Sequence, residues 1–363
     1  MRIIQIIDTL HAGGAERMAV NYANALANKI SFSGLIATRS EGDLLHQLDK
    51  NVNYLFLNKK NSLDFKAVLK LKRYIKANKI NIIHAHGTSF FIAVLVKIIY
   101  PKIAIIWHDH YGDSEFLSTR PKLILKLICP FFQGIIAVNQ KLFDWSKNEL
   151  KVKNTIYLSN FTSIEDAQNK TTLLKGISKK RIVCLANLRA QKNQFLILEM
   201  AHLLKIEYPN WSFHLVGKNF NDSYSLKLIN QIQDQNLSEN IFIYDSKSDI
   251  SNILDQAEIA ILTSKSEGLP VALLEYGLKS KAVIATNVGE ISTIINNAKN
   301  GFLVPSNNAH QFYDALKTLI SNPELRLEFG NNLKNTIQNT YAQSTIIAQY
   351  LKWLKNIYYE KSK

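Results

Sequence analysis

Residues 264–277, SKSEGLPVALLEYG, combine a Gly-Leu-Pro turn with the start of an apolar segment. Pro270 fits the first position of a helix, because its missing N–H costs nothing there and its φ is already helical. Gly268 and Leu269 then form the turn that leads into the helix and leave free backbone N–H groups at its tip. Such a tip attracts anions, because the unpaired donors and the helix dipole point the same way.

Two carboxylates flank this helix tip. Glu267 precedes the helix, and Glu275 lies about five residues inside it, roughly 7–8 Å further along at 1.5 Å per residue. Each carboxylate can accept hydrogen bonds from neighbouring hydroxyl groups of a ligand. A diphosphate at the tip would have one carboxylate on each side, and sugar, diphosphate and ribose is the ligand with that order of groups. We therefore hypothesise that the segment binds a nucleotide-linked sugar.

Strand-like runs alternate with helical patterns along the whole chain, which is typical of parallel sheets with helices on both faces. The first set of runs covers residues 2–8, 32–39, 80–86, 103–110, 134–138 and 154–160. The second set covers residues 181–187, 212–218, 241–245, 257–264, 282–287 and 302–305. Two successive sets predict an α/β protein with two doubly wound, Rossmann-like domains that face each other across a cleft.

The domain boundaries follow from composition and pattern. The polar stretch at residues 163–180 is the best candidate for a linker. We predict an N-terminal domain at residues 1–165 and a C-terminal domain at residues 175–340. The chain from Pro323 on has the pattern of two helices, and the segment at residues 341–363 could pack back on the N-terminal domain.

The composition indicates an anionic partner. A chain of 363 residues can hold two cores, and its formal charge of +15 predicts binding to nucleic acid, a phosphorylated ligand or an acidic membrane surface. Two cysteines far apart in the sequence are typical of a reduced cytosolic protein. The N-terminus resembles a first strand and not a signal peptide, and the most apolar stretch, residues 90–100, is too short to span a bilayer. We expect a cytoplasmic protein, either soluble or peripheral on a membrane.

A glycine loop follows the first predicted strand, at the end of a strand where ligands collect in open α/β sheets. Gly13 and Gly14 in HAGGAE let the backbone approach a ligand closely. A flexible turn would give the same pattern. The dinucleotide motif GxGxxG is absent, which argues against a nicotinamide enzyme.

Two pairs of histidines close two further strands. These are His84 with His86 and His108 with His110, and the members of each pair share one face because they are two residues apart. They could bind the metal of a metal-dependent hydrolase, or they could be hydrogen-bonded structural residues. The chain contains no HExxH or Asp-x-Asp motif, so we expect no metal. We expect His108 to contact a ligand.

Basic residues follow the first strand of the second half, in ANLRAQKN at residues 186–193. Lys192 or Arg189 could neutralise phosphate charge when bond cleavage leaves a diphosphate. A solvated basic loop would look the same.

Residues 59–79 predict a basic amphipathic helix. One face holds Lys66, Lys70, Arg73 and Ala77, and another holds Phe65, Val68, Leu71 and Ile75. The apolar face would pack on the sheet. The basic face could contact an anionic membrane, because each basic residue near such a surface contributes about 1 kcal/mol to the binding free energy.

Taken together, these motifs resemble those of the family 4 retaining glycosyltransferases, which have the two-domain GT-B fold. EGLPVALLE at residues 267–275 matches the family's Glu-x7-Glu motif. The segments at residues 12–16, 82–87, 158–164, 262–264, 282–290 and 300–305, and the histidine after IAIIW, fit the family's other blocks in order. The resemblance covers nearly the whole chain and is strongest from Ile182 to Pro305.

For the C-terminal domain, the resemblance implies that Glu275 holds the ribose hydroxyls and that Glu267 lies at the donor sugar ring near the reacting carbon. Lys192 would bind phosphate, and residues 268–270 would place backbone donors near the diphosphate. The nucleotide base would lie near residues 244–246.

For the N-terminal, acceptor-side domain, the resemblance implies that Gly13 and Gly14 close over the donor. His108 resembles the histidine that contacts the 6-hydroxyl of the sugar. One position departs from the family pattern, which has arginine five residues before the lysine. Asn187 stands there, and Arg189 could reach the phosphates instead.

The mechanism that these residues predict needs no metal and no other cofactor, because Lys192 and the helix tip match the charge of the leaving diphosphate. Retention of configuration by front-face attack is the favoured route. Glu267 as a covalent nucleophile is the alternative. Closure of the domains would limit hydrolysis of the donor.

We therefore expect a sugar transferase that uses a nucleotide-diphosphate sugar, with UDP as the expected nucleotide, and a glycan or lipid-linked acceptor. It would build surface polysaccharide, such as lipopolysaccharide or capsule, at the inner face of the cytoplasmic membrane, with residues 59–79 on the lipid. The alternatives are a metal-dependent hydrolase and a non-catalytic anion-binding protein. We expect no nucleic-acid partner, because no nucleic-acid-binding motif accompanies the charge.

Overall fold

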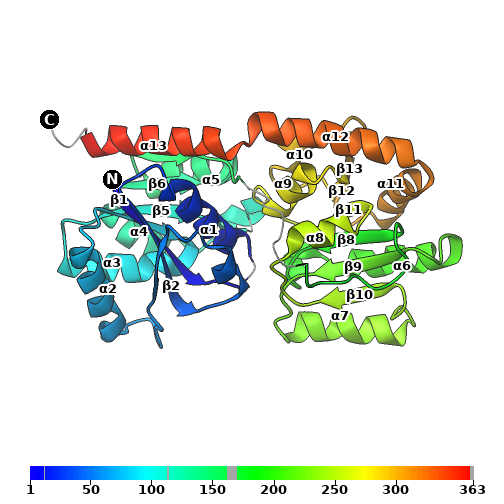
Figure 1. Ribbon diagram of the computed structural model, residues 1–363, viewed down its shortest axis with the longest axis horizontal. Helices are drawn as coiled ribbons and strands as arrows, with labels where there is room; N and C mark the ends of the chain where they lie inside the picture. The colour runs from blue at the N-terminus through cyan, green and yellow to red at the C-terminus, as the bar shows by residue number, and fades with distance from the viewer. Residues whose placement is uncertain (12, 113, 162–169, 360–363) are drawn as a thin grey trace. The chain divides into compact units, whose positions relative to one another are not determined.

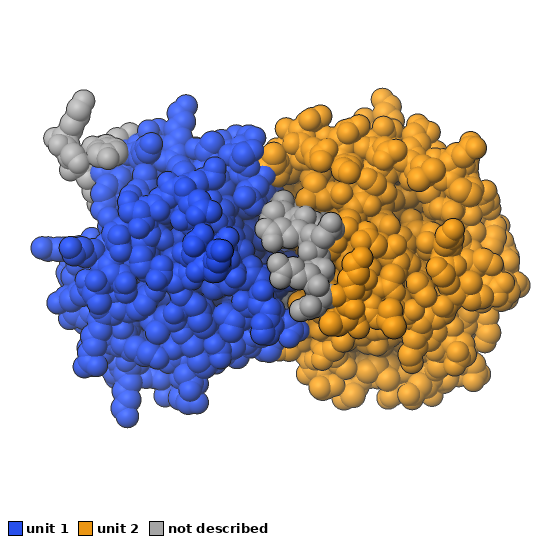
Figure 2. Space-filling view, in the orientation of Figure 1, with its two compact units in different colours: residues 1–161, 343–363 blue, residues 162–342 orange. Residues whose placement is uncertain are grey.

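The computed structural model describes the chain except residues 12, 113, 162–169 and 360–363. The chain forms two compact units (Figure 2). Unit 1 comprises residues 1–161 and 343–363, and unit 2 comprises residues 162–342. Unit 2 is therefore continuous in sequence, whereas unit 1 is built from both ends of the chain. The predicted linker lies partly outside the described residues.

Unit 1 is built on a seven-stranded parallel sheet with the order β3-β2-β1-β4-β5-β6-β7 (Figure 1). Its strands are β1 (Arg2–Thr9), β2 (Phe32–Ser40), β3 (Asn53–Phe56), β4 (Ile82–His86), β5 (Ala104–Asp109), β6 (Gly134–Ala137) and β7 (Thr155–Tyr157). The strand order reverses between β1 and β4, and ligands bind at such reversals beyond the carboxyl ends of the strands.

Helices cover both faces of this sheet. The α-helices are α1 (Gly14–Ala27), α2 (Phe65–Ala77), α3 (Phe90–Ile99), α4 (Leu123–Ile128), α5 (Gln140–Trp145) and α13 (Gln343–Tyr359). Short helical turns are η1 (Asp43–Gln47), η2 (Gly87–Ser89), η3 (Ser114–Thr119), η4 (Cys129–Phe131) and η5 (Ser146–Leu150). Helices α2, α3 and α4 share one apolar core with alternate residues of the strands, and α1 packs on the other face. The last helix of the chain, α13, contacts α1.

Unit 2 is built on a six-stranded parallel sheet with the order β10-β9-β8-β11-β12-β13. Its strands are β8 (Arg181–Leu185), β9 (Ser212–Val216), β10 (Ile241–Tyr244), β11 (Ile259–Leu262), β12 (Ala282–Thr286) and β13 (Phe302–Val304). Its helices are η6 (Ala190–Lys192), α6 (Phe195–Glu207), α7 (Ser223–Asp234), α8 (Ile250–Asp255), α9 (Val271–Leu278), α10 (Ile291–Ile294), α11 (Ala309–Ser321) and α12 (Pro323–Thr340). Here the order reverses between β8 and β11.

The central strands are buried on both faces, as is usual in parallel sheets. In β1, Ile3, Ile4 and Ile6 are fully buried, and so is the polar Gln5 between them. Buried amides are usually hydrogen-bonded, and the Oε1 of Gln5 lies 2.8 Å from a ring nitrogen of His86 in β4.

The predicted strands are confirmed with small shifts of their ends, and β3 is the strand that the sequence did not predict. The two helices predicted from Pro323 on are α12 and α13. The prediction of a helix over residues 59–79 is wrong at its start. Helix α2 begins at Phe65, because the carboxylate of Asp64 caps it by accepting a hydrogen bond from the N–H of Ala67.

The predicted faces of α2 are confirmed with one exception. Val68, Leu71 and Ile75 are buried, but Phe65 is 72% exposed. As the first residue of the helix, Phe65 lies beyond the edge of the apolar core. Among the described residues, no helix is both long and apolar enough to cross a membrane.

Candidate active site

Helix α9 follows β11 through the segment that carries the paired glutamates. Pro270 has φ −71° and ψ 122° and caps the helix, which begins at Val271. The prediction of Pro270 as the first helical residue is therefore wrong by one position, because its extended ψ still turns the chain into the helix, as N-cap residues do. Leu269 in the preceding turn is buried.

Tyr276 and Gly277 fix α9 against the sheet and its neighbouring helix. The buried Tyr276 hydroxyl accepts a hydrogen bond from the N–H of Leu185 at 2.7 Å and donates to the carbonyl of Ile261 at 3.3 Å. Gly277 lets α12 pack closely, since a Cβ there would lie 2.5 Å from a side-chain carbon of Ile337. The helix start is thereby held beside the strand reversal of unit 2.

Glu267 and Lys192 meet at this reversal. Glu267 is 5% exposed, and its Oε1 lies 2.6 Å from Lys192 Nζ and accepts a hydrogen bond from Ser264 Oγ at 2.6 Å. Thr263 Oγ1 donates to the carbonyl of Lys192 at 2.8 Å, which ties the loop after β8 to the loop after β11. The structure therefore joins two charged residues that are 75 positions apart in the sequence.

Gly289 holds the loop after β12 against the same segment. Its φ is +58°, and a Cβ there would lie 2.1 Å from the carbonyl oxygen of Glu267. The N–H of Glu290 donates to the carbonyl of Gly268 at 3.1 Å. Sequence reasoning quoted this loop only as part of a flanking strand, and its contact with Glu267 depends on the fold.

Glu275 is the fifth residue of α9 and is buried, with 4% exposure. The structure places it inside the helix that Glu267 precedes, as the sequence predicts. Tyr244, in the region predicted for the nucleotide base, ends β10, and its hydroxyl accepts a hydrogen bond from the N–H of Lys175 at 2.8 Å.

Asn187 has a structural role that an arginine could not take, because arginine has no side-chain hydrogen-bond acceptor. Its Oδ1 accepts a hydrogen bond from the N–H of Lys218 at 2.8 Å, and its carbonyl accepts one from Gln194 at 2.9 Å. Nearby, the exposed Arg189 stacks on the ring of Phe220 at 4.6 Å, and Lys218 Nζ lies 5.4 Å from the same ring. Sequence reasoning missed Lys218 and Phe220, although they follow β9 as other site residues follow their strands.

In unit 1, the glycine loop opens α1. Gly13 caps the helix with an extended backbone, and Gly14 is its first residue. A Cβ on Gly13 would lie 2.3 Å from Glu16 Oε2, whereas a Cβ on Gly14 would have no atom within 4 Å. Gly14 therefore leaves open space beside the backbone at the end of β1.

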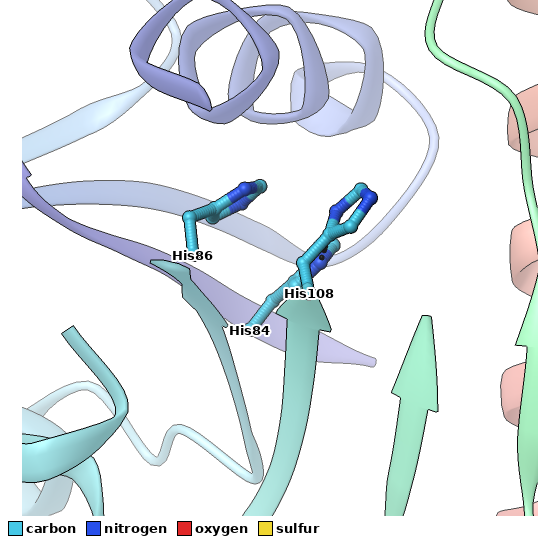
Figure 3. A group of neighbouring side chains, drawn as sticks. All are labelled: His84, His86 and His108. Atoms are coloured by element: carbon cyan, nitrogen blue, oxygen red, sulfur yellow. Dashed lines mark hydrogen bonds between the residues drawn. The ribbon is translucent and has the colours of Figure 1, made fainter. Parts of the chain in front are cut away.

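Four histidines form one cluster: His84 and His86 on β4, His108 on β5, and His110 just after β5. Figure 3 shows the first three. The rings of His84 and His86 stack with centroids 4.4 Å apart, and those of His108 and His110 are tilted by 31° with centroids 4.0 Å apart. Pairs of ring nitrogens are hydrogen-bonded, His84 Nε2 to His108 Nδ1 at 3.1 Å and His86 Nδ1 to His110 Nε2 at 2.9 Å.

Two residues that sequence reasoning missed complete the cluster. Gln5 Oε1 lies 2.8 Å from His86 Nε2, and the hydroxyl of Tyr350 on α13 lies 3.1 Å from His84 Nδ1. Tyr22 of α1 packs its ring edge against His84 at 5.0 Å. No pattern in the sequence connects Tyr350 with histidines 266 positions away.

The cluster is electrically neutral at ordinary pH. Burial lowers the pKa of all four histidines, and that of His110 falls to about 3. His108 is 1% exposed, and its Nε2 has no hydrogen-bond partner among the described residues.

Metal binding is one of the alternatives that the sequence offers for these histidines. One ring nitrogen each of His84, His86 and His108 lies within 4.8 Å of the others, close enough to share a metal ion. Metal ligands must point their lone pairs at one centre. Both ring nitrogens of His84 and His86 and the Nδ1 of His108 are instead hydrogen-bonded to neighbouring side chains, and His108 Nε2 alone has no partner among the described residues. The arrangement fits a hydrogen-bonded network better than a metal site.

Two family models cover most of the chain. The model for glycosyltransferase family 4 matches residues 12–160, and the model for glycosyl transferases group 1 matches residues 166–336. An uncharacterized glycosyltransferase of Methanocaldococcus jannaschii is 31% identical over 269 residues, which cover 72% of each chain. The chain belongs to the family 4 glycosyltransferases.

Further comparisons agree with this family 4 glycosyltransferase assignment. The UDP-Gal:alpha-D-GlcNAc-diphosphoundecaprenol alpha-1,3-galactosyltransferase of Escherichia coli is 25% identical, with 90% of each chain covered. A crystal structure of Staphylococcus aureus TarM, in complex with UDP and other ligands, superimposes with a TM-score of 0.79 at 15% identity. It covers 97% of this chain and 99% of that one, and this likeness shows the GT-B fold.

Proposed function

We propose that this glycosyltransferase moves a sugar, with retention of configuration, from a UDP-sugar to a lipid-linked or glycan acceptor of a bacterial-type surface polysaccharide. The observation that carries the proposal is the ion pair between the half-buried Lys192 and the buried Glu267 just before α9, with Glu275 inside that helix. A cation, the first N–H groups of a helix and two carboxylates match a phosphate flanked by hydroxyl-bearing groups.

The candidate site residues of unit 2 each have a role in the proposed reaction. The diphosphate lies at the start of α9, where residues 268–270 lead into the first N–H groups of the helix, and Lys192 neutralises the charge that grows as the sugar–phosphate bond breaks. Glu275 binds the ribose hydroxyls. Arg189, exposed beside Lys218, adds positive charge on the phosphate side.

The proposed transfer is a front-face substitution. The bond from the anomeric carbon to the leaving phosphate breaks, the acceptor oxygen bonds to the same face, and its proton passes to a phosphate oxygen. Glu267 supports the positive charge on the sugar and does not form a covalent bond. Lys192 and Ser264 both hydrogen-bond its Oε1, and this withdraws electron density that a nucleophile would need.

Unit 1 supplies the other groups in this proposal. Gly13 and Gly14 bring backbone close to the donor, and His108 contacts a sugar hydroxyl. We do not propose a metal-dependent hydrolase, because the chain belongs to a glycosyltransferase family and the histidine nitrogens serve a hydrogen-bonded network. No metal takes part in the proposed step.

The names of the compared proteins support the choice of substrates. The E. coli relative is named for a UDP-linked donor and a diphosphoundecaprenol acceptor, and the TarM complex contains UDP. The donor class can be tested directly by measuring UDP release from a panel of UDP-sugars with a polyprenyl-diphosphate sugar acceptor, with and without EDTA.

The site assignment is tested with three variants. We expect Glu267→Ala and Lys192→Ala to lower kcat at least 100-fold, since each removes charge stabilisation of the transition state. Lys299→Ala, an exposed lysine remote from this pair, should keep the wild-type rate. Full turnover by either of the first two variants contradicts the assignment, and loss of turnover with EDTA contradicts the metal-free mechanism.

We also propose that the protein works as a peripheral protein on an anionic membrane, at the inner face of the cytoplasmic membrane. Lys66, Lys70 and Arg73 of α2 are exposed on one face. The layer formed by α2, α3, α4 and the segments beside them also exposes large apolar side chains. These are Leu63, Phe65, Leu69, Phe91, Ile98, Ile99, Phe116, Leu123, Ile124 and Leu127. Apolar groups interleaved with lysines suit the boundary of an anionic bilayer.

Vesicle flotation tests this surface. Reversing Lys66, Lys70 and Arg73 to glutamate should abolish binding to vesicles rich in phosphatidylglycerol, and the binding of the wild type should weaken with salt. A charge-matched control reverses Lys205, Lys227 and Lys299, which are exposed on unit 2. Equal binding by both triple variants would refute the assignment to α2.

A further inference from the structure

Tyr350, His84 and His108 form a chain of hydrogen bonds inside unit 1. The Tyr350 hydroxyl lies 3.1 Å from His84 Nδ1, and His84 Nε2 lies 3.1 Å from His108 Nδ1. All three side chains are buried, with exposures of 0%, 0% and 1%. The chain ends at His108 Nε2, which has no hydrogen-bond partner among the described residues.

The positions of the hydrogens in this chain follow from burial. Burial raises the pKa of Tyr350 well above its usual value, so the hydroxyl keeps its proton. Burial lowers the pKa of His84 and His108, so each ring is neutral and carries one hydrogen. Leaving a buried O–H without an acceptor costs free energy, and His84 Nδ1 lies within hydrogen-bond distance of the Tyr350 hydroxyl, at 3.1 Å. Tyr350 therefore donates to His84 Nδ1.

The positions of the other hydrogens along this row of hydrogen bonds then follow. His84 has its hydrogen on Nε2 and donates it to His108 Nδ1, so the hydrogen of His108 must be on Nε2. The other two histidines follow the same rule. Gln5 Oε1 accepts from His86 Nε2, which leaves His86 Nδ1 to accept from His110 Nε2. All four rings thus share one tautomer, with no donor facing another donor.

We propose that Tyr350 is a positioning residue that holds His108 in the Nε2–H tautomer, through His84, and so makes His108 a hydrogen-bond donor. The group that His108 meets must then offer an acceptor oxygen, such as the lone pair of a sugar hydroxyl or a phosphate oxygen. The assignment of that group to the sugar donor rests on the proposed function, whereas the tautomer does not.

The same contacts disfavour the opposite direction of donation along these hydrogen bonds. If His84 donated to Tyr350, then His108 would carry its hydrogen on Nδ1 and present an acceptor. In the described part of the chain, the Tyr350 proton would then have only the Gln5 side chain beside it, and Gln5 Oε1 already accepts from His86 Nε2 at 2.8 Å. Helix α13, from the far end of the sequence, thus decides the chemical character of a residue on β5.

The test is nitrogen NMR of protein labelled with ¹⁵N-histidine, compared between wild type, Tyr350→Phe and Tyr22→Phe. The chemical shifts of the two ring nitrogens report which one carries the hydrogen. Tyr22 is a matched control, because it is fully buried, its ring lies 5.1 Å from that of Tyr350, and its hydroxyl has no hydrogen-bond partner among the described residues.

We expect the wild type and Tyr22→Phe to show His84 and His108 as Nε2–H alone. In Tyr350→Phe, both rings should become mixtures of tautomers, because nothing then fixes the hydrogen of His84. A Tyr350→Phe protein in which His108 stays entirely Nε2–H overturns the proposal. So does a Tyr22→Phe protein that shows the same mixture.

Activity separates this inference from the proposed function. If His108 donates to the sugar donor, Tyr350→Phe should lower kcat/KM for the donor about 2- to 10-fold, and Tyr22→Phe should not. If the tautomer changes while kcat/KM stays the same, the role of Tyr350 stands and the contact of His108 with the donor is refuted.

Discussion

At position 267, a carboxylate with 5% exposure lies between a lysine and a serine. The charge of Lys192 is therefore paired with that of Glu267. In the proposed reaction, a diphosphate would compete with this carboxylate for the ammonium group. The ion pair thus holds the half-buried lysine in one place near the start of α9.

Gly289 offers a test at the residue scale. With φ +58° and its Cβ position 2.1 Å from the Glu267 carbonyl, Gly289→Ala must displace that peptide. We expect a loss of about 1–3 kcal/mol in the free energy of unfolding and a clear fall in kcat. Gly14→Ala is the stability control, because its Cβ has open space and alanine favours a helix by up to about 1 kcal/mol. Urea unfolding measures both, and equal stabilities would contradict the contact.

At the scale of elements, β4 and β5 bring the histidines together. The strands are adjacent and parallel, and His86 is paired in register with His108. Alternation along each strand then points the two residues of each pair to the same face. A polar cluster on one face of a buried sheet follows, and α1 and α13 supply the tyrosines that cover it.

This cluster predicts that unit 1 loses stability in acid. In the folded state burial lowers the pKa of all four histidines, that of His110 to about 3, whereas the unfolded chain takes up protons near pH 6.5. The unfolded state binds more protons below pH 6.5, so stability is full above that pH and falls as the pH drops. Each histidine contributes about 1.4 kcal/mol per pH unit.

Urea unfolding between pH 7.5 and 4.5 measures this slope. His110→Asn should reduce it by about 1.4 kcal/mol per pH unit, because one of the titrating groups is gone. In unit 2, among the described histidines, burial lowers the pKa of His214 alone, to about 3. The stability of unit 2 should therefore change less steeply with pH than that of unit 1. A stability of unit 1 that does not change over this range would refute the neutral cluster.

At the scale of the whole molecule, the chain crosses from unit 1 to unit 2 and returns. Helix α13 belongs to unit 1 and buries Ile346, Ile347, Tyr350, Leu354 and Ile357. Each such side chain contributes about 1.5–3 kcal/mol on burial. Their sum is comparable with the entire stability of a typical domain.

Truncation tests this division. A fragment of residues 162–342 contains a complete sheet and its helices, so we expect cooperative unfolding on heating. A fragment of residues 1–161 lacks α13 and should not fold cooperatively. Adding a peptide of residues 343–359 should restore its cooperative transition, as followed by circular dichroism. Cooperative unfolding of residues 1–161 alone would show that α13 is dispensable.

Much of the fold could be predicted from local pattern. Nearly every strand was found, because buried parallel strands are continuous apolar runs. The exception, β3, is a four-residue edge strand, Asn53–Phe56, whose side chains are half-buried or exposed, so its pattern is weak. The starts of α2 and α9 were misplaced, because the caps at Asp64 and Pro270 depend on backbone angles that the sequence does not state.

The sequence by itself determined the two sheets, the turn that carries Glu267 and the family, because these depend on short-range periodicity and turn chemistry. Only the tertiary structure decided how residues far apart in the chain meet. It paired Lys192 with Glu267, gave Asn187 its task in a loop, and placed Tyr350 on His84. The physical reason is that such contacts depend on strand order and helix packing, which bring distant segments to one sheet edge.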